Sequence, residues 1–246
     1  MQGLVEVKDL HVRYGDYEAV KGVSFSLGKG EILGIVGESG SGKSTIAKTL
    51  MGLTQSSGGS IAWGSGIRDR GSEVQMIFQD AVGSLNPRMT VRQTLEEVLR
   101  VGKRSPDRLS RSGQETASPL SLLDLVGLSQ AVLDQYPREM SGGQCQRVSI
   151  ARALACEPEV LIADEPVSAL DVSVQARILN LLRDLRRDLG LSIILIAHDL
   201  AVVKNVCDRI CVMEHGLFVD VGDAEEVFDH PTSEYTKRLL AAVPRI

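Results

Sequence analysis

An eight-residue stretch, Gly37-Glu38-Ser39-Gly40-Ser41-Gly42-Lys43-Ser44, decides the fold of this chain of 246 residues. It separates a short apolar run, Ile32–Val36, from a segment whose apolar residues have helical spacing, Lys43–Leu53. Glycines at these positions let backbone N–H groups turn toward phosphate oxygens, and the start of the helix adds positive potential. Lys43 then reaches the terminal phosphates, and Ser44 supplies a ligand for Mg²⁺. We therefore predict a strand, a phosphate-binding loop and a helix. A plain glycine turn before a helix is the alternative, and the expected strand and helix on either side of the motif disfavour it.

Two adjacent acidic residues, Asp164 and Glu165, follow a second apolar run, Val160–Ala163. Ligands of open α/β sheets bind at the carboxyl ends of the strands, which is where these acids are expected to lie. Asp164 suits the shell of a Mg²⁺ ion. Glu165 faces another direction and is placed to polarise an attacking water. Alone, the pair would equally fit a solvated turn; beside a phosphate loop it predicts a hydrolytic site.

A second glycine pair, in Met140-Ser141-Gly142-Gly143-Gln144, opens another expected helix with Ser141 as its N-cap. This is a second anion-binding helix start in one chain. Since one nucleotide site needs only one such cradle, the extra one is best explained if it faces the nucleotide of a second copy. We therefore expect a head-to-tail dimer with ATP between its subunits.

The remaining patterns place these motifs in a single α/β domain spanning 1–246. An antiparallel β region is expected at the start, with a turn at Tyr14–Tyr17, and further buried strands are expected at Ser192–Ala197 and Arg209–Met213. Residues 82–155 have helical patterns, with a capping pair at Thr90 and Gln93 and a polar stretch, Gly102–Ser118, expected to be an exposed loop. The predicted fold is an α/β core of 1–81 and 156–246 with a mostly parallel sheet, an antiparallel β subdomain and an inserted helical subdomain, 82–155.

Composition excludes several classes of protein. With 43% hydrophobic residues and a net charge of −5, the chain is not expected to be disordered. The longest apolar runs have five residues, against about 20 needed to cross a bilayer, and the first residues do not resemble a secretion signal, so a cytosolic location is expected. The net negative charge gives no general attraction to nucleic acids. The four cysteines lack metal-ligand spacing and are expected to be reduced packing residues.

The motifs together resemble the ATP-binding cassette family over essentially the whole chain. Met140–Gln144 resembles the family's signature, Leu-Ser-Gly-Gly-Gln, with Met140 as a replacement of similar volume. The resemblance implies that Tyr14 stacks on adenine, that Gln79 touches the metal and couples to membrane subunits, and that His198 contacts the γ-phosphate. Asp171 matches the D-loop, which crosses the dimer interface. Without the resemblance, Gln79 would be a surface polar residue and His198 a strand-end core histidine.

The family pattern defines the full set of expected site residues. Catalytic roles fall to Lys43, Gln79, Glu165 and His198. Metal ligands are Ser44, Gln79 and Asp164. Nucleotide contacts come from Tyr14, Gly37, Glu38, Ser39, Gly40, Ser41, Gly42, Lys43, Ser44 and Thr45. Contacts across the dimer come from Ser141, Gly142, Gly143 and Gln144, with Asp171 in the D-loop. Cys145, which follows the signature where a basic residue is frequent, raises the hypothesis of thiol sensitivity.

Several stretches resemble the ATPases of the peptide and nickel importer group more specifically, such as Ser84–Arg88, Glu165–Ala176 and His230–Pro231. The resemblance implies an ATPase that uses ATP and Mg²⁺, works on the cytoplasmic face of the membrane, and has as partners a second ATPase subunit, two membrane permease subunits and, indirectly, an extracytoplasmic solute-binding protein. Oligopeptides or dipeptides are the expected cargo, and nickel or another small solute is the alternative. A soluble cassette ATPase acting on nucleic acid or ribosomes is a competing class, disfavoured by the single cassette and the charge. A degenerate cassette without turnover is disfavoured because Gly142, Glu165 and His198 are present.

Overall fold

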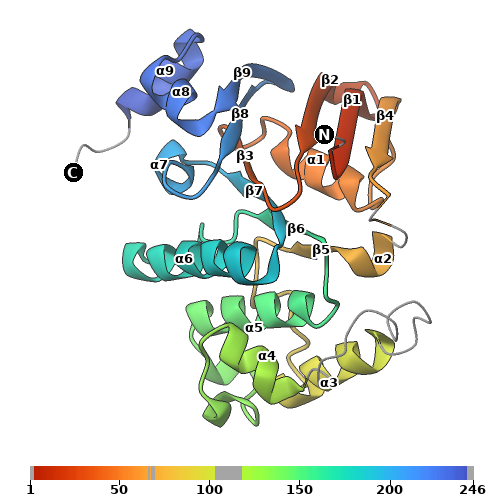
Figure 1. Cartoon of the computed structure of the whole chain (residues 1–246), viewed down its shortest axis with the longest axis vertical. Helices are drawn as coiled ribbons and strands as arrows, with labels where there is room; N and C mark the ends of the chain where they lie inside the picture. The colour runs from red at the N-terminus through yellow and green to blue at the C-terminus, as the bar shows by residue number, and fades with distance from the viewer. Residues whose placement is uncertain (1–2, 66, 68–69, 103–117, 243–246) are drawn as a thin grey trace.

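The computed structural model describes residues 3–65, 67, 70–102 and 118–242. Its central element is a six-stranded sheet with the strand order β5-β6-β7-β3-β8-β9 (Figure 1). Neighbouring strands are parallel, except that β9 runs antiparallel to β8. The strands are β3 (Ile32–Val36), β5 (Val74–Ile77), β6 (Val160–Asp164), β7 (Ser192–Ala197), β8 (Arg209–Glu214) and β9 (Leu217–Asp223). The predicted mostly parallel sheet is therefore confirmed.

A second, antiparallel sheet of three strands, ordered β2-β1-β4, lies beside it. Its strands are β1 (Val5–Tyr14), β2 (Tyr17–Leu27) and β4 (Gly58–Trp63). The hairpin turns at the predicted place, because Tyr14 pairs with Tyr17 and Gly15 adopts a left-handed φ of 59° between them. The predicted antiparallel β region is confirmed, and β4 adds a strand that the pattern did not indicate.

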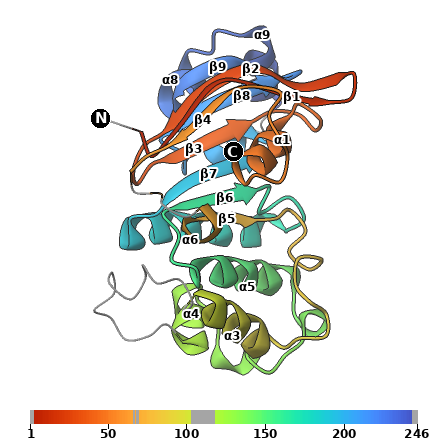
Figure 2. The ribbon, with the colours of Figure 1, turned by 90° about the vertical axis from the view of Figure 1, so that its right-hand side faces the viewer.

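The two faces of the large sheet pack against different layers. Along β3, Leu33 and Ile35 face the antiparallel sheet and the helix α1 (Lys43–Leu50), whereas Ile32 and Val36 face the opposite layer. This two-residue alternation is the ordinary pleat of a strand buried on both sides. Helix α1 consequently lies between the two sheets, directly after the loop at the end of β3 (Figure 2).

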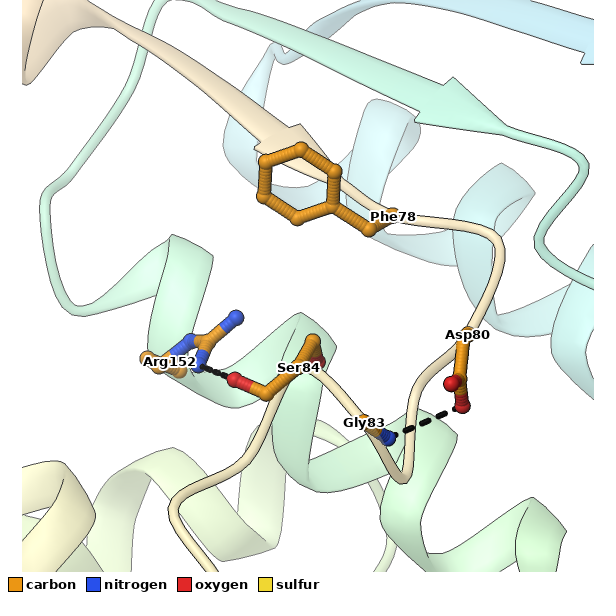
Figure 3. Close-up of a pocket in the computed structure, with 5 residues that line it drawn as sticks. All are labelled: Phe78, Asp80, Gly83, Ser84 and Arg152. Carbon is orange, nitrogen blue, oxygen red and sulfur yellow. Dashed lines mark hydrogen bonds between the residues drawn. The ribbon is translucent and has the colours of Figure 1, made fainter.

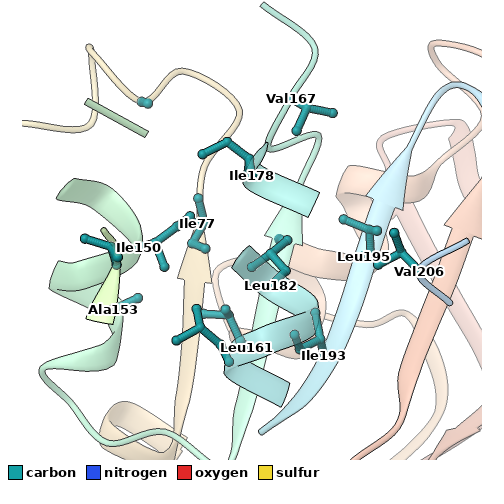
Figure 4. Packing of buried hydrophobic residues seen from close by; sticks show 14 of the residues in the cluster. Ile77, Ile150, Ala153, Leu161, Val167, Ile178, Leu182, Ile193, Leu195 and Val206 are labelled. Atoms are coloured by element: carbon teal, nitrogen blue, oxygen red, sulfur yellow. The ribbon is translucent and has the colours of Figure 1, made fainter. Parts of the chain in front are cut away.

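Three helices, α3 (Val91–Gly102), α4 (Pro119–Leu125) and α5 (Gly142–Leu154), gather at one end of the molecule (Figure 1). The backbone N–H of Thr90 donates to Gln93 Oε1 at 2.9 Å, which confirms the capping pair. Helix α5 joins the helical part to the sheet through buried residues that include Ile77, Ile150, Ala153 and Leu161 (Figure 4). The expected loop lies outside the described residues over 103–117, and the subdomain boundaries at 82 and 155 stay predictions.

Helix α6 (Val172–Leu189) covers the face of the sheet opposite α1 and ends at Gly190, which adopts a φ of 65°. Ile178, Leu182 and Leu185 lie on its buried side, whereas Leu189 in the last turn is 49% exposed.

The chain closes with short elements that sequence patterns did not predict. They are α7 (Leu200–Val203), α8 (Ala224–Asp229) and α9 (Glu234–Ala241), in addition to α2 (Arg70–Glu73) earlier in the chain. The four cysteines form no disulfide among the described residues; Cys145, Cys207 and Cys211 are buried, and Cys156 is partly buried. Within the described ranges, no helix combines the length and the apolar character that a membrane crossing requires.

Candidate nucleotide-binding and hydrolysis site

The loop between β3 and α1 has the backbone shape that an anion cradle needs. Gly40 and Gly42 adopt φ values of 82° and 112°, a region that residues with a side chain rarely occupy. A Cβ at Gly37 would lie 2.1 Å from the carbonyl oxygen of Met213, so this glycine is required by close packing. Gly42 caps α1 without a side-chain hydrogen bond. The N–H groups of the first turn are therefore not claimed by a capping side chain.

Lys43 is almost completely buried, with 3% of its side chain exposed. Its Nζ donates hydrogen bonds to the carbonyl oxygens of Gly37 at 2.7 Å and Glu38 at 2.8 Å. Burial lowers the pKa of Lys43, and the nearby carboxylates of Glu165 and Asp164 oppose this shift. The ammonium is thus held inside the loop, where its two hydrogen bonds go to neutral carbonyl oxygens and the nearest carboxylate, Glu165 Oε1, lies 3.9 Å away. Such a cation is ready to exchange its carbonyl partners for phosphate oxygens.

The hydroxyl of Ser41 provides a second sign of an anion site. It is buried in the same loop and has no hydrogen-bond partner among the described residues. Buried hydroxyls are normally paired, and an unpaired one is costly. A phosphate oxygen entering the loop would supply the missing partner.

Ser44 and Asp164 form the pair expected to hold a metal. Ser44 Oγ donates to Asp164 Oδ1 at 2.9 Å, joining the first turn of α1 to the end of β6. Asp164 is 5% exposed, and burial raises its pKa, with the hydrogen bond from Ser44 opposing. Hydroxyl and carboxylate oxygens are the hard ligands that Mg²⁺ prefers, and Mg²⁺ uses few protein ligands together with substrate phosphates. The two residues therefore fit a magnesium ion that is completed by a nucleotide.

Glu165 occupies the centre of the site. It has a φ of 45°, which is unusual for a residue with a side chain, so β6 bends sharply at this position. One carboxylate oxygen, Oε2, accepts a hydrogen bond from Gln79 Nε2 at 2.9 Å, and the other, Oε1, lies 3.9 Å from Lys43 Nζ. The structure thus brings together Lys43, Gln79 and Glu165 from three separate elements. A carboxylate oriented in this way is suited to accept a proton from a water molecule.

Gln79 lies two residues after β5, in the loop that follows this strand. Its nitrogen is bound to Glu165, which leaves its amide oxygen available to a metal.

His198 directly follows Ala197, which pairs with Val36 at the end of β3, so it lies at the same edge of the sheet. Its side chain is exposed and, within the described part of the chain, has no hydrogen bond to the other expected site residues. The structure places His198 beside the site without joining it to the site.

Tyr14 lies at the tip of the β1–β2 hairpin with 48% of its surface exposed. Its hydroxyl is 3.4 Å from Thr54 Oγ1, just beyond α1. An exposed ring in this position is available for stacking on a flat apolar ligand. Of the other expected nucleotide contacts, Ser39 is exposed in the loop and Thr45 is partly buried in the first turn of α1.

The signature residues, Ser141 to Gln144, lie at the start of α5. Ser141 caps α5, its Oγ accepting from the N–H of Gln144 at 3.3 Å while Gln144 Oε1 accepts from the N–H of Ser141 at 2.9 Å. A Cβ on Gly143 would lie 2.7 Å from Val174 Cγ1, so the glycine allows α5 to begin close to α6. Helices α5 and α1 pack on opposite faces of the large sheet (Figures 1 and 2). The cradle of α5 is therefore separated from the phosphate loop of its own chain.

Asp171 caps α6. Its Oδ1 accepts from Ser173 Oγ at 2.7 Å and from the N–H of Val174 at 3.0 Å, and the hydrogen bond from Ser173 lowers its pKa. Val172, the next residue, is 81% exposed.

Cys145, at the start of α5, is fully buried. Its Sγ lies 3.5 Å from the carbonyl oxygen of Pro137, and burial raises its pKa. This environment argues against the thiol sensitivity expected from the sequence.

A hollow of about 450 Å³ lies beside the segment that carries Gln79. It is lined by residues of the loop after β5 and by one residue of α5: Phe78, Asp80, Gly83, Ser84 and Arg152 (Figure 3). Arg152 donates to the carbonyl oxygen of Ser84 at 2.5 Å, and the N–H of Gly83 donates to Asp80 Oδ1 at 2.9 Å, so the loop is firmly shaped. Phe78 is 40% exposed, which gives the hollow an apolar wall.

Sequence reasoning missed the residues that support the loop from behind. Met213 lies at the end of β8 against Gly37 and Gly42, and the N–H of Glu38 donates to the hydroxyl of Tyr235 at 2.9 Å. Tyr235 lies 197 positions from Glu38 and belongs to a helix of only eight residues. Local patterns contain no signal for such a contact.

Comparisons with known proteins agree with this geometry. Residues 20–168 match the family described as ABC transporter. The oligopeptide transport ATP-binding protein OppF of Salmonella typhimurium is 46% identical over 263 aligned positions, which cover 98% of this chain and 78% of that protein.

Solved structures give the same result. The structure of CbiO1 from Clostridium perfringens, part of the ABC transporter complex CbiONQ, has a TM-score of 0.79 at 28% identity and covers 100% of this chain and 97% of that one. A dimeric ATP-binding cassette, MJ0796, in a post-hydrolysis state with ADP and Pi, has a TM-score of 0.71 at 27% identity and covers 89% of this chain and 98% of that one.

Proposed function

The chain belongs to the ABC transporter family, and on that premise we propose that it is the ATP-binding and ATP-hydrolysing subunit of an importer for oligopeptides. The observation that carries the proposal is the meeting of Lys43, Gln79 and Glu165 beside the Ser44–Asp164 pair. This constellation contains a phosphate-binding cation, a metal-binding pair and an oriented carboxylate. The name of the Salmonella relative favours oligopeptides over nickel as cargo.

The residues divide the work of phosphoryl transfer among them. Backbone N–H groups from Gly40 to Thr45 bind phosphate oxygens, Lys43 neutralises the terminal phosphates, and Tyr14 stacks on the base. Glu165 accepts a proton from the attacking water, and His198 contacts the transferred phosphate from the neighbouring strand end. Ser44, Asp164 and the Gln79 amide oxygen would hold Mg²⁺, which would neutralise charge on the phosphates.

Two copies form the working unit, with the start of α5 in one protomer lying over the phosphate loop of the other. The separation of α5 from its own loop supports this arrangement, as does the dimeric state of MJ0796. Ser141, Gly142 and Gly143 would then present N–H groups to the partner's nucleotide, Gln144 would keep the cap intact, and the exposed residues after Asp171 would line the interface. Hydrolysis would release the dimer and reset it.

The hollow lined by Phe78 and Arg152 is the docking site for a membrane permease subunit. It follows β5 in the same loop as Gln79, so a partner seated there would sense changes at Glu165. Two permease subunits would hold the dimer on the cytoplasmic face of the membrane, and an extracytoplasmic solute-binding protein would deliver the peptide to them.

The proposal is tested by uptake and by hydrolysis together. In cells that depend on this chain, labelled oligopeptide uptake should be lost on substitution of Glu165→Gln, whereas nickel uptake should be unchanged. The purified chain should hydrolyse ATP only when Mg²⁺ is present. Loss of nickel uptake with intact peptide uptake would contradict the assigned cargo. Tight, salt-dependent binding of the chain to DNA or RNA would support the competing class instead.

A further inference from the structure

The C-terminal helix touches the phosphate loop. The backbone N–H of Glu38 donates a hydrogen bond to the hydroxyl of Tyr235 at 2.9 Å. Tyr235 lies in the first turn of α9 and is 5% exposed, so little water competes for this bond. Tyr235 is therefore placed to hold the loop.

This hydrogen bond is made by the same peptide group whose carbonyl oxygen accepts a hydrogen bond from Lys43. The carbonyl of Gly37 and the N–H of Glu38 belong to one peptide unit, and Gly37 O accepts from Lys43 Nζ at 2.7 Å. The unit is thus fixed from both sides, by an ammonium and by a phenol hydroxyl. When Lys43 turns toward a phosphate, the carbonyl loses that partner. Tyr235 then remains as the side chain that fixes the orientation of a peptide whose glycine would otherwise let it rotate.

Helix α9 is itself firmly anchored. Asp220 on β9 accepts hydrogen bonds from the N–H groups of Thr232 at 3.1 Å and Ser233 at 3.0 Å and from the hydroxyls of Thr232 and Thr236. Ser233 caps the helix. These hydrogen bonds fix the start of α9 to strand β9.

The ring of Tyr235 has one further contact, with an exposed side chain. The guanidinium of Arg238 lies 5.9 Å from the ring centroid and 3.4 Å from Glu214 at the end of β8. The Arg238 side chain is 74% exposed, so this contact contributes little to the position of the phenol hydroxyl, which depends on the anchor of α9.

We propose that Tyr235 is a positioning residue for nucleotide binding, which keeps the Gly37–Glu38 peptide in the orientation that accepts a triphosphate after Lys43 has left it. The inference rests on the proposed ATPase function. Without the hydroxyl, a fraction of the free protein would have the peptide rotated, and the apparent affinity falls by that fraction. Bound nucleotide restores the orientation, so the turnover at saturation is preserved.

The test is Tyr235→Phe, which removes one oxygen and keeps the ring. We expect the KM for MgATP to rise about three- to tenfold, the range for one buried hydrogen bond, with kcat within about twofold of wild type. The Tm should fall by only about 2–4 °C, the effect of about 1 kcal/mol in a chain of this size. The Kd for MgADP, measured by equilibrium titration without any hydrolysis step, should rise by a similar factor. The matched control is Arg238→Met, which removes an exposed contact of the ring but keeps the hydroxyl, and it should leave KM unchanged.

Two results would overturn the inference. One is a wild-type KM and Kd in Tyr235→Phe. The other is an equal rise of KM in both variants with a larger fall in Tm, because α9 would then act only as general support. If the wild-type chain did not hydrolyse ATP, the proposed function would fail, whereas the MgADP titration would still decide the role of Tyr235.

Discussion

The hydroxyl of Ser44 donates a hydrogen bond to Asp164 Oδ1 at 2.9 Å and so connects the first turn of α1 with the carboxyl end of β6. The two residues are 120 positions apart in the sequence, and only the parallel pairing of β6, β7 and β3 brings them together. Asp164 is buried, and burial raises its pKa. A buried carboxyl of this kind gains most when a cation neutralises it, which is the physical basis for placing Mg²⁺ there.

Ser44→Ala tests the metal assignment. The variant removes one oxygen ligand and leaves Asp164 without its hydrogen bond, so we expect the Mg²⁺ concentration for half-maximal ATP hydrolysis to rise by about tenfold or more. Titration of the ATPase rate with MgCl₂ measures this directly. Ser121→Ala, which removes an exposed hydroxyl on α4, serves as the control. An unchanged Mg²⁺ requirement in Ser44→Ala would remove Ser44 from the metal site.

Lys43→Ala should weaken nucleotide binding and hydrolysis together. The ammonium lies within the loop on the carbonyls of Gly37 and Glu38, and its loss leaves the phosphate charge unopposed. A loss of at least about tenfold in ATP affinity is expected, measured by equilibrium titration. Lys237→Ala, which removes an exposed lysine paired with Glu234, should bind as the wild type does. Wild-type affinity in Lys43→Ala would make the phosphate-cradle assignment wrong.

Gly143→Ala tests the role of the second glycine pair. The new Cβ would lie 2.7 Å from Val174 Cγ1, so we expect a loss of about 1–3 kcal/mol in the free energy of unfolding. Val174→Ala in the same chain should restore much of this stability. If α5 faces the partner's nucleotide, hydrolysis should stay low in the stabilised double variant while MgADP binding is unaffected. Full hydrolysis in the double variant would show that the glycine serves packing alone.

Asp220→Asn tests the anchor of α9. Burial raises the pKa of Asp220, but the hydrogen bonds from Thr232, Thr236 and the backbone outweigh burial and hold the pKa below the ordinary value of 3.8. The folded pKa is thus below the unfolded one, so the stabilisation is fully present above about pH 4 and is lost as the pH falls through the folded pKa.

The asparagine variant should therefore be less stable by about 1–3 kcal/mol at pH 7. The difference from wild type should shrink below pH 4, as measured by chemical unfolding at a series of pH values. A difference that is constant across this range would mean that the charge of Asp220 does not contribute to the anchor.

Strong local patterns predicted most of the central sheet. The strands β3, β6, β7 and β8 each contain a short run of mainly apolar residues, and each strand formed where its run lies. Strand β4 has an exposed glycine-containing sequence, and α9 has only eight residues. Neither therefore has a local sequence pattern that distinguishes it from a loop. Their formation depends on tertiary contacts such as the hydrogen bonds of Asp220.

In the site, too, local motifs were predictable and contacts between distant residues were not. The phosphate loop and the two acids were predictable, because the chemistry fixes residue types at neighbouring positions. The bond between Gln79 and Glu165, 86 positions apart, and the positive φ of Glu165 were not, because they arise from the sheet order and from a bend at one strand end. The support of Glu38 by Tyr235 had no sequence signal at all, since it joins opposite ends of the chain.

The most direct test of the account is the rate of MgATP hydrolysis by Glu165→Gln compared with wild type at saturating nucleotide. Glutamine keeps the size of the side chain and its capacity to bond with Gln79, but it cannot accept a proton from water. We predict active hydrolysis by the wild-type chain, a fall of about 10²- to 10⁴-fold in the variant, and ATP affinity that is retained. Wild-type turnover by Glu165→Gln would contradict the account, because the carboxylate at the centre of the site would then have no part in the chemistry.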